Sequence, residues 1–169
     1  FTKNSFLAEK IKMICNHGSK QKYNHEIVGV NSRLDSIQAA ILRVKLKRLN
    51  SYLSLRYESA SLYSSQLKDI NWIETPFEEH YSQHVYHQYT IKVLNGKRDG
   101  LKEHLSSLNI PTTVYYPKSL HKQLAFKKSK SGSFPNSNNL ESKVLSLPMH
   151  TELKKKTILH IVNSIKSFK

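Results

Sequence analysis

The sequence predicts a mixed α/β chain in which a long helix leads into a smaller α+β domain. Apolar residues recur at spacings of three and four from Leu34 to Val44, as one face of a helix requires. The pattern continues loosely to Leu67 without a proline or glycine. Beyond it, strand, helix and strand patterns follow one another within about thirty residues, as in an α/β or α+β unit. Because so long a helix exceeds the size of one small domain, we expect it to connect two regions.

Local patterns predict the other elements. A short helix comes first, at residues 6–16. Alternating apolar and polar residues predict a strand at 85–94, and Asn95-Gly96 predicts the turn that ends it. A helix follows at 98–108, a second strand at 112–116 and a helix at 139–147. A last helix, capped by Thr151, is expected to turn these residues inward: Ile158, Ile161, Val162, Ile165 and Phe168. In the helix at 98–108 the inward residues are expected to be Leu101, Leu105 and Leu108.

The predicted start of the long helix is a candidate anion site. Ser32, followed three residues later by Asp35, has the form of a capping box. Free backbone N–H groups and the helix dipole attract anions at such a place. Asn31 offers an amide beside it, and Arg33 offers a planar fork suited to carboxylate or phosphate. The alternative interpretation is that Ser32 caps the helix and Arg33 is solvated.

Charge and composition bear on the class of protein. The net charge of +15 invites a nucleic-acid interpretation, but lysine supplies 22 of the 27 basic residues, whereas base-edge recognition relies heavily on arginine. We therefore expect no nucleic-acid partner. No apolar run approaches the ~20 residues of a membrane span. A single cysteine excludes an internal disulfide and favours a cytoplasmic protein.

A metal site is not expected. His17 and His25 lie in a polar loop, eight positions apart, without an accompanying carboxylate or cysteine pattern. His84 and His87 are an odd number of positions apart, so on a strand they would point to opposite faces.

Five segments together resemble one known family. They are LAEKIKMICNHGS, YNHEIVGVNSRLDSIQAAILRVKL, HVYHQYTI with KRDGLKEHL, IPTTVYYPKSLHKQLAF, and LSLPMH with the terminal helix. In this order they resemble the C-terminal part of the pyridoxal-phosphate (PLP)-dependent sugar aminotransferases, the DegT/DnrJ/EryC1/StrS family. The resemblance implies the C-terminal portion of the aspartate-aminotransferase-like fold (fold type I). Residues 1–31 would then be the remnant of the large PLP-binding domain, 32–68 the long connecting helix, and 69–169 the small C-terminal α+β domain.

The resemblance also implies an activity. Members of the family transfer an amino group, usually from glutamate, to a nucleotide-linked keto sugar, in amino-sugar and polysaccharide biosynthesis. Their cofactor is pyridoxal 5'-phosphate, and they are homodimers whose active sites are shared between the subunits. We therefore expect a chain that works in the cytoplasm on nucleotide keto sugars.

The resemblance also implies roles for the residues of this sequence that match the family's site positions. The resemblance implies that Asn31 reaches the cofactor phosphate held by the neighbouring subunit, and that Arg33 faces the sugar or its phosphates. Tyr115, Tyr116 and His121 match the loop that lines the sugar-nucleotide pocket. The alternative is that the two tyrosines pack in the core of the small domain and that His121 lies on the surface.

Two features depart from the family pattern. The Schiff-base lysine is expected upstream of Phe1, so we expect no catalytic residue in this chain and no activity of the chain alone. Lys118-Ser119 stands where the family commonly has an apolar residue and proline, which puts the rigidity of that loop in question. Two alternatives stay open: a non-catalytic fragment or lysine-less relative, and a sugar dehydratase with histidine in place of the lysine.

Overall fold

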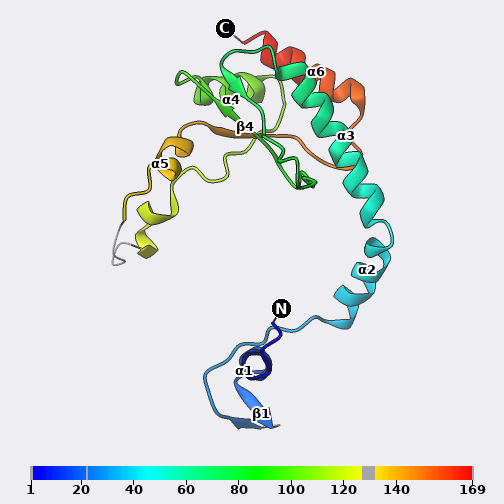
Figure 1. Cartoon of the computed structure of the whole chain (residues 1–169), viewed down its shortest axis with the longest axis vertical. Coiled ribbons are helices and arrows are strands. Elements are labelled where there is room, and N and C mark those ends of the chain that lie inside the picture. Colours follow the sequence, from blue (N-terminus) through cyan, green and yellow to red (C-terminus); the bar gives the residue numbers. More distant parts are fainter. Residues whose placement is uncertain (1, 22, 127–131, 169) are drawn as a thin grey trace. The chain divides into compact units, whose positions relative to one another are not determined.

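The computed structural model describes residues 2–21, 23–126 and 132–168 (Figure 1). The chain divides into two compact units, Phe1–Leu49 and Asn50–Lys169. The division falls inside the segment predicted to be one connecting helix.

The first unit is built around a helix and a small hairpin. Helix α1 (Ser5–Cys15) begins at Asn4, whose side chain accepts a hydrogen bond of 3.1 Å from the backbone N of Leu7. Strands β1 (Ser19–Gln21) and β2 (Asn24–His25) pair antiparallel. The turn from α1 into β1 requires glycine, because Gly18 has φ of +76° and a Cβ there would lie 1.7 Å from the carbonyl oxygen of Ile27.

The predicted single helix at 32–68 is wrong: the structure has two helices. Helix α2 (Ser36–Leu46) and helix α3 (Leu49–Leu67) are separated by a turn at residues 47–48. At this turn the backbone N of Arg48 donates to the carbonyl of Lys45 at 3.0 Å, three residues back, so the ladder of bonds to the fourth preceding residue is interrupted. The pattern of apolar residues carries no signal for such a break.

The predicted helix start is also displaced. The N-cap of α2 is Asp35 rather than Ser32, and its backbone N donates to Oε1 of Gln38 at 3.3 Å. The capping box therefore lies three residues later than predicted.

The helices of the first unit leave many of their apolar residues in solvent. The described residues of α1 and α2 include no buried side chain. The predicted apolar face of α2 is exposed, with Ile37 at 77% and Val44 at 66%. Periodicity identified the apolar face correctly, but this chain supplies nothing in the described part of the unit that covers it.

The second unit contains the hydrophobic core around a three-stranded antiparallel sheet of order β3-β4-β5. The strands are β3 (Ile73–Glu74), β4 (Tyr89–Val93) and β5 (Val144–Leu147). Ile73 pairs with Val93, and Tyr89 pairs with Leu147. In Figure 1 helices α3, α4 (Arg98–Ser107) and α6 (Lys155–Lys166) gather at this sheet, and all three contribute to the core.

Three elements of this unit were predicted correctly in kind. β4 lies within the predicted strand and buries Tyr89, Ile91 and Val93, although the preceding residues 85–88 are outside it. Helix α4 buries Leu101 and Leu105 as expected, whereas Leu108 is its C-cap and is exposed. Helix α6 buries the predicted face, with Phe168 half-buried beside it, but its N-cap is Lys154 rather than Thr151.

Two other predictions were wrong. The segment 112–116 is not a strand: Thr113 forms only an isolated bridge to Ser146. The segment 139–147 is not one helix, because helix α5 (Pro135–Glu141) ends inside it at Glu141 and β5 occupies its second half. Pairing with β4 buries Leu145, Ser146 and Leu147 in the sheet. The stabilisation from this pairing and burial outweighs a weak local preference for helix.

Of the helices among the described residues, none has both the length and the apolar content that a membrane span requires.

Candidate functional site

Asn31 lies in an exposed strip of backbone that is tied to the end of α1. It forms an antiparallel bridge with Asn16. On either side, the backbone N of Val30 donates to Ile14 O at 2.8 Å, and the backbone N of Ser32 donates to Cys15 O at 3.0 Å. Asn31 is exposed, so its amide is presented to solvent from a backbone fixed on both sides.

The sequence argument placed Asn31 and Arg33 beside a helix N-terminus, and this placement is wrong. Since α2 begins after Asp35, both residues precede the helix in extended chain. The anion-binding argument from the helix dipole therefore does not apply to them, because that effect falls off within the first turn. Arg33 is exposed and keeps a planar, charged fork.

The two tyrosines of the predicted pocket are exposed rather than packed in the core. Tyr115 is 45% exposed and Tyr116 is 76% exposed. Their ring centroids are 6.0 Å apart, edge to face. The backbone just before them is fixed, because Thr113 exchanges hydrogen bonds of 3.1 and 2.8 Å with Ser146 and Val114 packs on the core. The loop thus leaves the sheet with two aromatic rings in solvent.

His121 is half-buried in a short 3-10 helix, η1 (Leu120–Lys122), which a second one, η2 (Leu124–Phe126), follows. Its Nε2 is 3.1 Å from Oδ1 of Asn138, on α5. Its ring stacks on Phe134, with centroids 4.7 Å apart and an interplanar angle of 26°. The imidazole is therefore held by two contacts, and the neutral ring has Nδ1 as its remaining polar atom.

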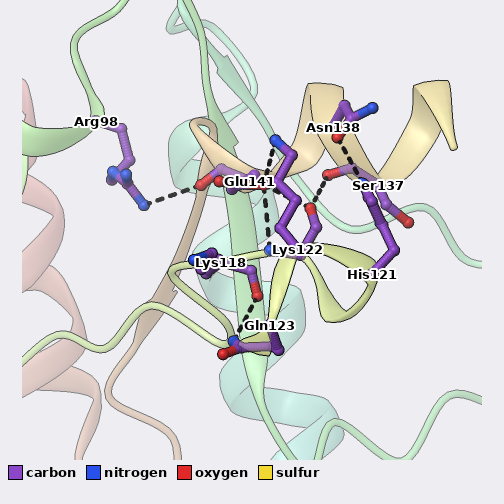
Figure 2. Close-up of polar contacts among 9 residues, drawn as sticks. Arg98, Lys118, His121, Lys122, Gln123, Ser137, Asn138 and Glu141 are labelled. Atoms are coloured by element: carbon purple, nitrogen blue, oxygen red, sulfur yellow. Dashed lines mark hydrogen bonds and ion pairs between the residues drawn. The ribbon is translucent and has the colours of Figure 1, made fainter. Parts of the chain in front are cut away.

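A carboxylate that the sequence analysis missed holds the same loop. Oε2 of Glu141 accepts hydrogen bonds from Ser119, at 2.6 Å from the hydroxyl and 3.1 Å from the backbone N, and it pairs with Nζ of Lys122 at 2.9 Å. Figure 2 shows Glu141 facing Lys122 across the gap between α5 and η1. The Ser119 hydroxyl first, and then Lys122, lower the pKa of Glu141 to about 2.

One signal could have drawn attention to Glu141. It is the only acidic residue between Glu103 and Glu152, in a stretch that carries six lysines. Charge alone does not tell which lysine or hydroxyl it meets, since the partners lie about twenty positions away.

The structure groups the predicted residues by unit. Tyr115, Tyr116 and His121 belong to the second unit, and Asn31 and Arg33 belong to the first. In the described part of the chain, no three histidine, cysteine, aspartate or glutamate side chains gather in a way that could hold a metal ion. Nδ1 of His25 instead lies 2.8 Å from the carbonyl oxygen of His17.

Comparison with known proteins identifies the family to which this chain is similar. A profile of the DegT/DnrJ/EryC1/StrS aminotransferase family matches residues 1–166. The chain is 41% identical, over 99% of its length and 45% of the relative's, to a pleiotropic regulatory protein of Geobacillus stearothermophilus. It is 35% identical to the dTDP-3-amino-3,4,6-trideoxy-alpha-D-glucose transaminase of Streptomyces venezuelae, over 96% of this chain and 43% of that protein.

A solved structure agrees in fold. The crystal structure of a DegT DnrJ EryC1 StrS aminotransferase from Brucella abortus superposes with a TM-score of 0.87 at 36% identity, covering 99% of this chain and 45% of that one. The fold is therefore that of the C-terminal portion of an aspartate-aminotransferase-like, PLP-dependent sugar aminotransferase. The chain belongs to the DegT/DnrJ/EryC1/StrS aminotransferase family. It spans less than half the length of the relatives it matches.

Proposed function

We propose that this chain is the C-terminal part of a PLP-dependent aminotransferase that moves an amino group from glutamate to a nucleotide-linked keto sugar. The observation that carries the proposal is the 35% identity, over nearly the whole chain, to a transaminase named for a dTDP-linked amino sugar. Residues 1–31 would belong to the large PLP-binding domain, 32–68 to the connection and 69–169 to the small domain.

Asn31 is assigned to the phosphate of the cofactor held by a second subunit. An amide donates hydrogen bonds without adding charge, and the backbone bonds on both sides of Asn31 fix where the amide stands. These residues fit a phosphate group, since Arg33 adds a cation nearby in the same exposed strip. When bound, PLP would act as the electron sink of the transamination.

Tyr115, Tyr116 and His121 are assigned to the sugar-nucleotide pocket. Two exposed aromatic rings offer flat surfaces on which a nucleotide base or sugar ring can pack. His121 is held by Asn138 and Phe134, so its Nδ1, the acceptor nitrogen of the neutral ring, stands in a fixed direction for a hydroxyl group. The loop would orient the acceptor sugar and exclude water around it.

A homodimer is part of the proposal. The apolar face of α2 is exposed in this chain, including Ile37, Ile41 and Val44, and a second subunit would cover such a face. Equilibrium sedimentation of the complete protein should give a dimer. A monomer that retains full transaminase activity would refute the shared site.

The experiment that tests the function is an assay with the complete protein that contains this chain. With PLP, glutamate and a dTDP- or UDP-linked keto sugar, we expect 2-oxoglutarate and the corresponding amino sugar, detected together by mass spectrometry. Absence of both products with every nucleotide keto sugar tried would overturn the proposal.

A second candidate is a non-catalytic relative without the Schiff-base lysine. The observation that favours it is the 41% identity to a protein named as a regulator. The residue at the lysine position, expected upstream of Phe1, separates the candidates: lysine supports the aminotransferase, histidine a dehydratase, and any other residue a regulator.

A further inference from the structure

Besides the contacts of His121 with Asn138 and Phe134, one carboxylate holds the loop that carries His121 to α5. The Ser119 hydroxyl is within 3.0 Å of the Ser137 carbonyl as well as 2.6 Å of Glu141 Oε2. A hydroxyl has a single proton, so Ser119 donates its hydrogen bond to the closer, charged acceptor, which is Glu141 Oε2. The backbone N of Ser119 and the Lys122 ammonium converge on the same oxygen. One atom of Glu141 thus binds both the first and the last residue of the segment 119–122.

Glu141 is itself tied to the folded core. Nη1 of Arg98, at the start of α4, donates to the Glu141 carbonyl at 3.4 Å and to the Val144 carbonyl at 3.5 Å. Val144 begins β5, which pairs with β4 in the central sheet. In Figure 2 the Arg98 side chain points to the Glu141 backbone, while the Glu141 carboxylate points to the loop. Glu141 therefore links the core to the loop: its backbone carbonyl is bound by Arg98, and its carboxylate binds Ser119 and Lys122.

Without this link the contacts of His121 with Asn138 and Phe134 remain, but the rest of the loop has few constraints of its own. Two short 3-10 helices make up most of residues 120–126, and helices of this length are marginal by themselves. Leu120 is 69% exposed and Leu124 is 81% exposed, so burial of these side chains does not anchor the loop. Ser119 does not restrict the backbone as a proline would.

We propose that Glu141 and Ser119 are positioning residues of the sugar-nucleotide pocket, and that their hydrogen bonds fix the loop from which His121 faces the acceptor sugar. This inference rests on the proposed function and adds two residues to those that determine the proposed pocket. Glu141 does not touch the substrate; it acts through Ser119 and Lys122.

The first arm of the test measures the loop in this chain. Hydrogen exchange of the Ser119 amide should be at least about tenfold faster in Glu141→Ala than in the wild type, because its acceptor is gone. The matched control is Glu74→Ala, which removes an exposed glutamate that also pairs with a lysine at 2.9 Å but lies on β3. Equal exchange at Ser119 in wild type and Glu141→Ala would overturn the proposal.

The second arm measures the two half-reactions of the complete enzyme separately. In Glu141→Gln, which keeps shape but loses charge, the KM for the nucleotide keto sugar should rise about tenfold, as a small displacement of a positioning loop produces. The glutamate half-reaction should stay unchanged. A loss of both half-reactions alike would mean general misfolding and would overturn a positioning role.

Ser119→Ala provides the second variant should Glu141 substitutions impair folding. It removes only the hydroxyl donor and should raise the same KM in the same direction, by a smaller factor. A wild-type enzyme that is inactive in both half-reactions contradicts the proposed function. An active wild type whose sugar KM is unchanged by Ser119→Ala and Glu141→Gln contradicts this inference alone.

Discussion

Arg56, on α3, holds the backbone of Tyr86 from thirty positions away in the chain. Its Nη1 donates to the Tyr86 carbonyl at 3.1 Å, and the same nitrogen lies 3.1 Å from the His87 carbonyl and 3.5 Å from the Met149 carbonyl. Residues 85–88 were predicted to form the first part of the strand at 85–94 and lie outside β4. The guanidinium instead satisfies the carbonyls that a neighbouring strand would have satisfied.

Arg56→Ala should therefore destabilise the second unit by about 1–3 kcal/mol, because it leaves part-buried carbonyls without a charged donor. Urea unfolding followed by circular dichroism would measure the change. Arg56→Lys should recover only part of the loss, since an ammonium cannot reproduce the planar fork. Lys102→Ala, at an exposed position of α4, is the control and should be within about 0.5 kcal/mol of wild type.

The stability of the second unit should fall at alkaline pH. Tyr63 and Tyr89 stack at 5.0 Å in the core, and burial raises the pKa of Tyr89 to about 12 and that of Tyr63 above its usual 10.0. Each folded-state pKa exceeds the unfolded value, so the stabilisation is present below pH 10 and is lost as the pH rises through the folded-state values.

The free energy of unfolding, measured at a series of pH values, should show this decline. Tyr89→Phe should make the decline shallower, whereas Tyr116→Phe, at an exposed position, is the control. A decline that is equally steep in Tyr89→Phe would contradict the assignment.

Gly18→Ala should disrupt the strip that carries Asn31. The new Cβ would meet the Ile27 carbonyl at 1.7 Å, and φ of +76° adds strain. Gly96→Ala is the matched control, since its φ is +69° but a Cβ there meets no atom within 4 Å. Backbone amide signals of residues 14–31 should shift or broaden in Gly18→Ala. The first unit's spectrum should be unaltered in Gly96→Ala, and equal effects would refute the steric argument.

The Glu141 carboxyl should titrate with a pKa of about 2, and this pKa should rise toward the usual 4.5 when the hydrogen-bond donors are removed. Its pKa lies below the usual 4.5 because Ser119 and Lys122 stabilise the charged form. A folded-state pKa below the unfolded one means that the stabilisation is present above pH 4.5 and is lost as the pH falls toward 2. Carboxyl chemical shifts in Ser119→Ala should give a pKa nearer 4.5, while Glu74 should titrate as in the wild type.

Asn31→Ala should weaken retention of the cofactor in the complete enzyme by about tenfold or more, the effect of losing one hydrogen bond to a charged phosphate. Dialysis followed by absorbance of the bound PLP measures it. Asn71→Ala, exposed in the second unit, should retain the cofactor as the wild type does. Unchanged retention in Asn31→Ala would remove Asn31 from the proposed site.

The chain alone should not bind PLP through a lysine of its own. The Schiff-base lysine is expected upstream of Phe1, so adding PLP should give no new visible absorbance that survives dialysis and depends on one lysine. A stable band that a single lysine substitution abolishes would contradict this prediction.

The candidate site residues were assigned from the sequence by the types and the order of the residues in the motifs, and not by their geometry. The segment around His121 was predicted as a loop, whereas Tyr115 and Tyr116 were also placed at the end of a strand that does not form; both tyrosines are exposed. Asn31 was expected beside a helix N-terminus, yet it stands in extended chain, because the capping residue is Asp35. Capping signals of similar form lay three residues apart, and local sequence did not distinguish them.

The sequence by itself determined the family and the elements whose apolar faces are long and regular, such as α4, α6 and the core of β4. Only the tertiary structure decided the break between α2 and α3, the strand identity of residues 144–147 and the contact of Glu141 with Ser119. Periodicity reports which face of a segment is apolar, and that property is local. Strand pairing and a hydrogen bond across twenty-two positions depend on which distant partner the fold brings within reach, and this information is not carried by either segment alone.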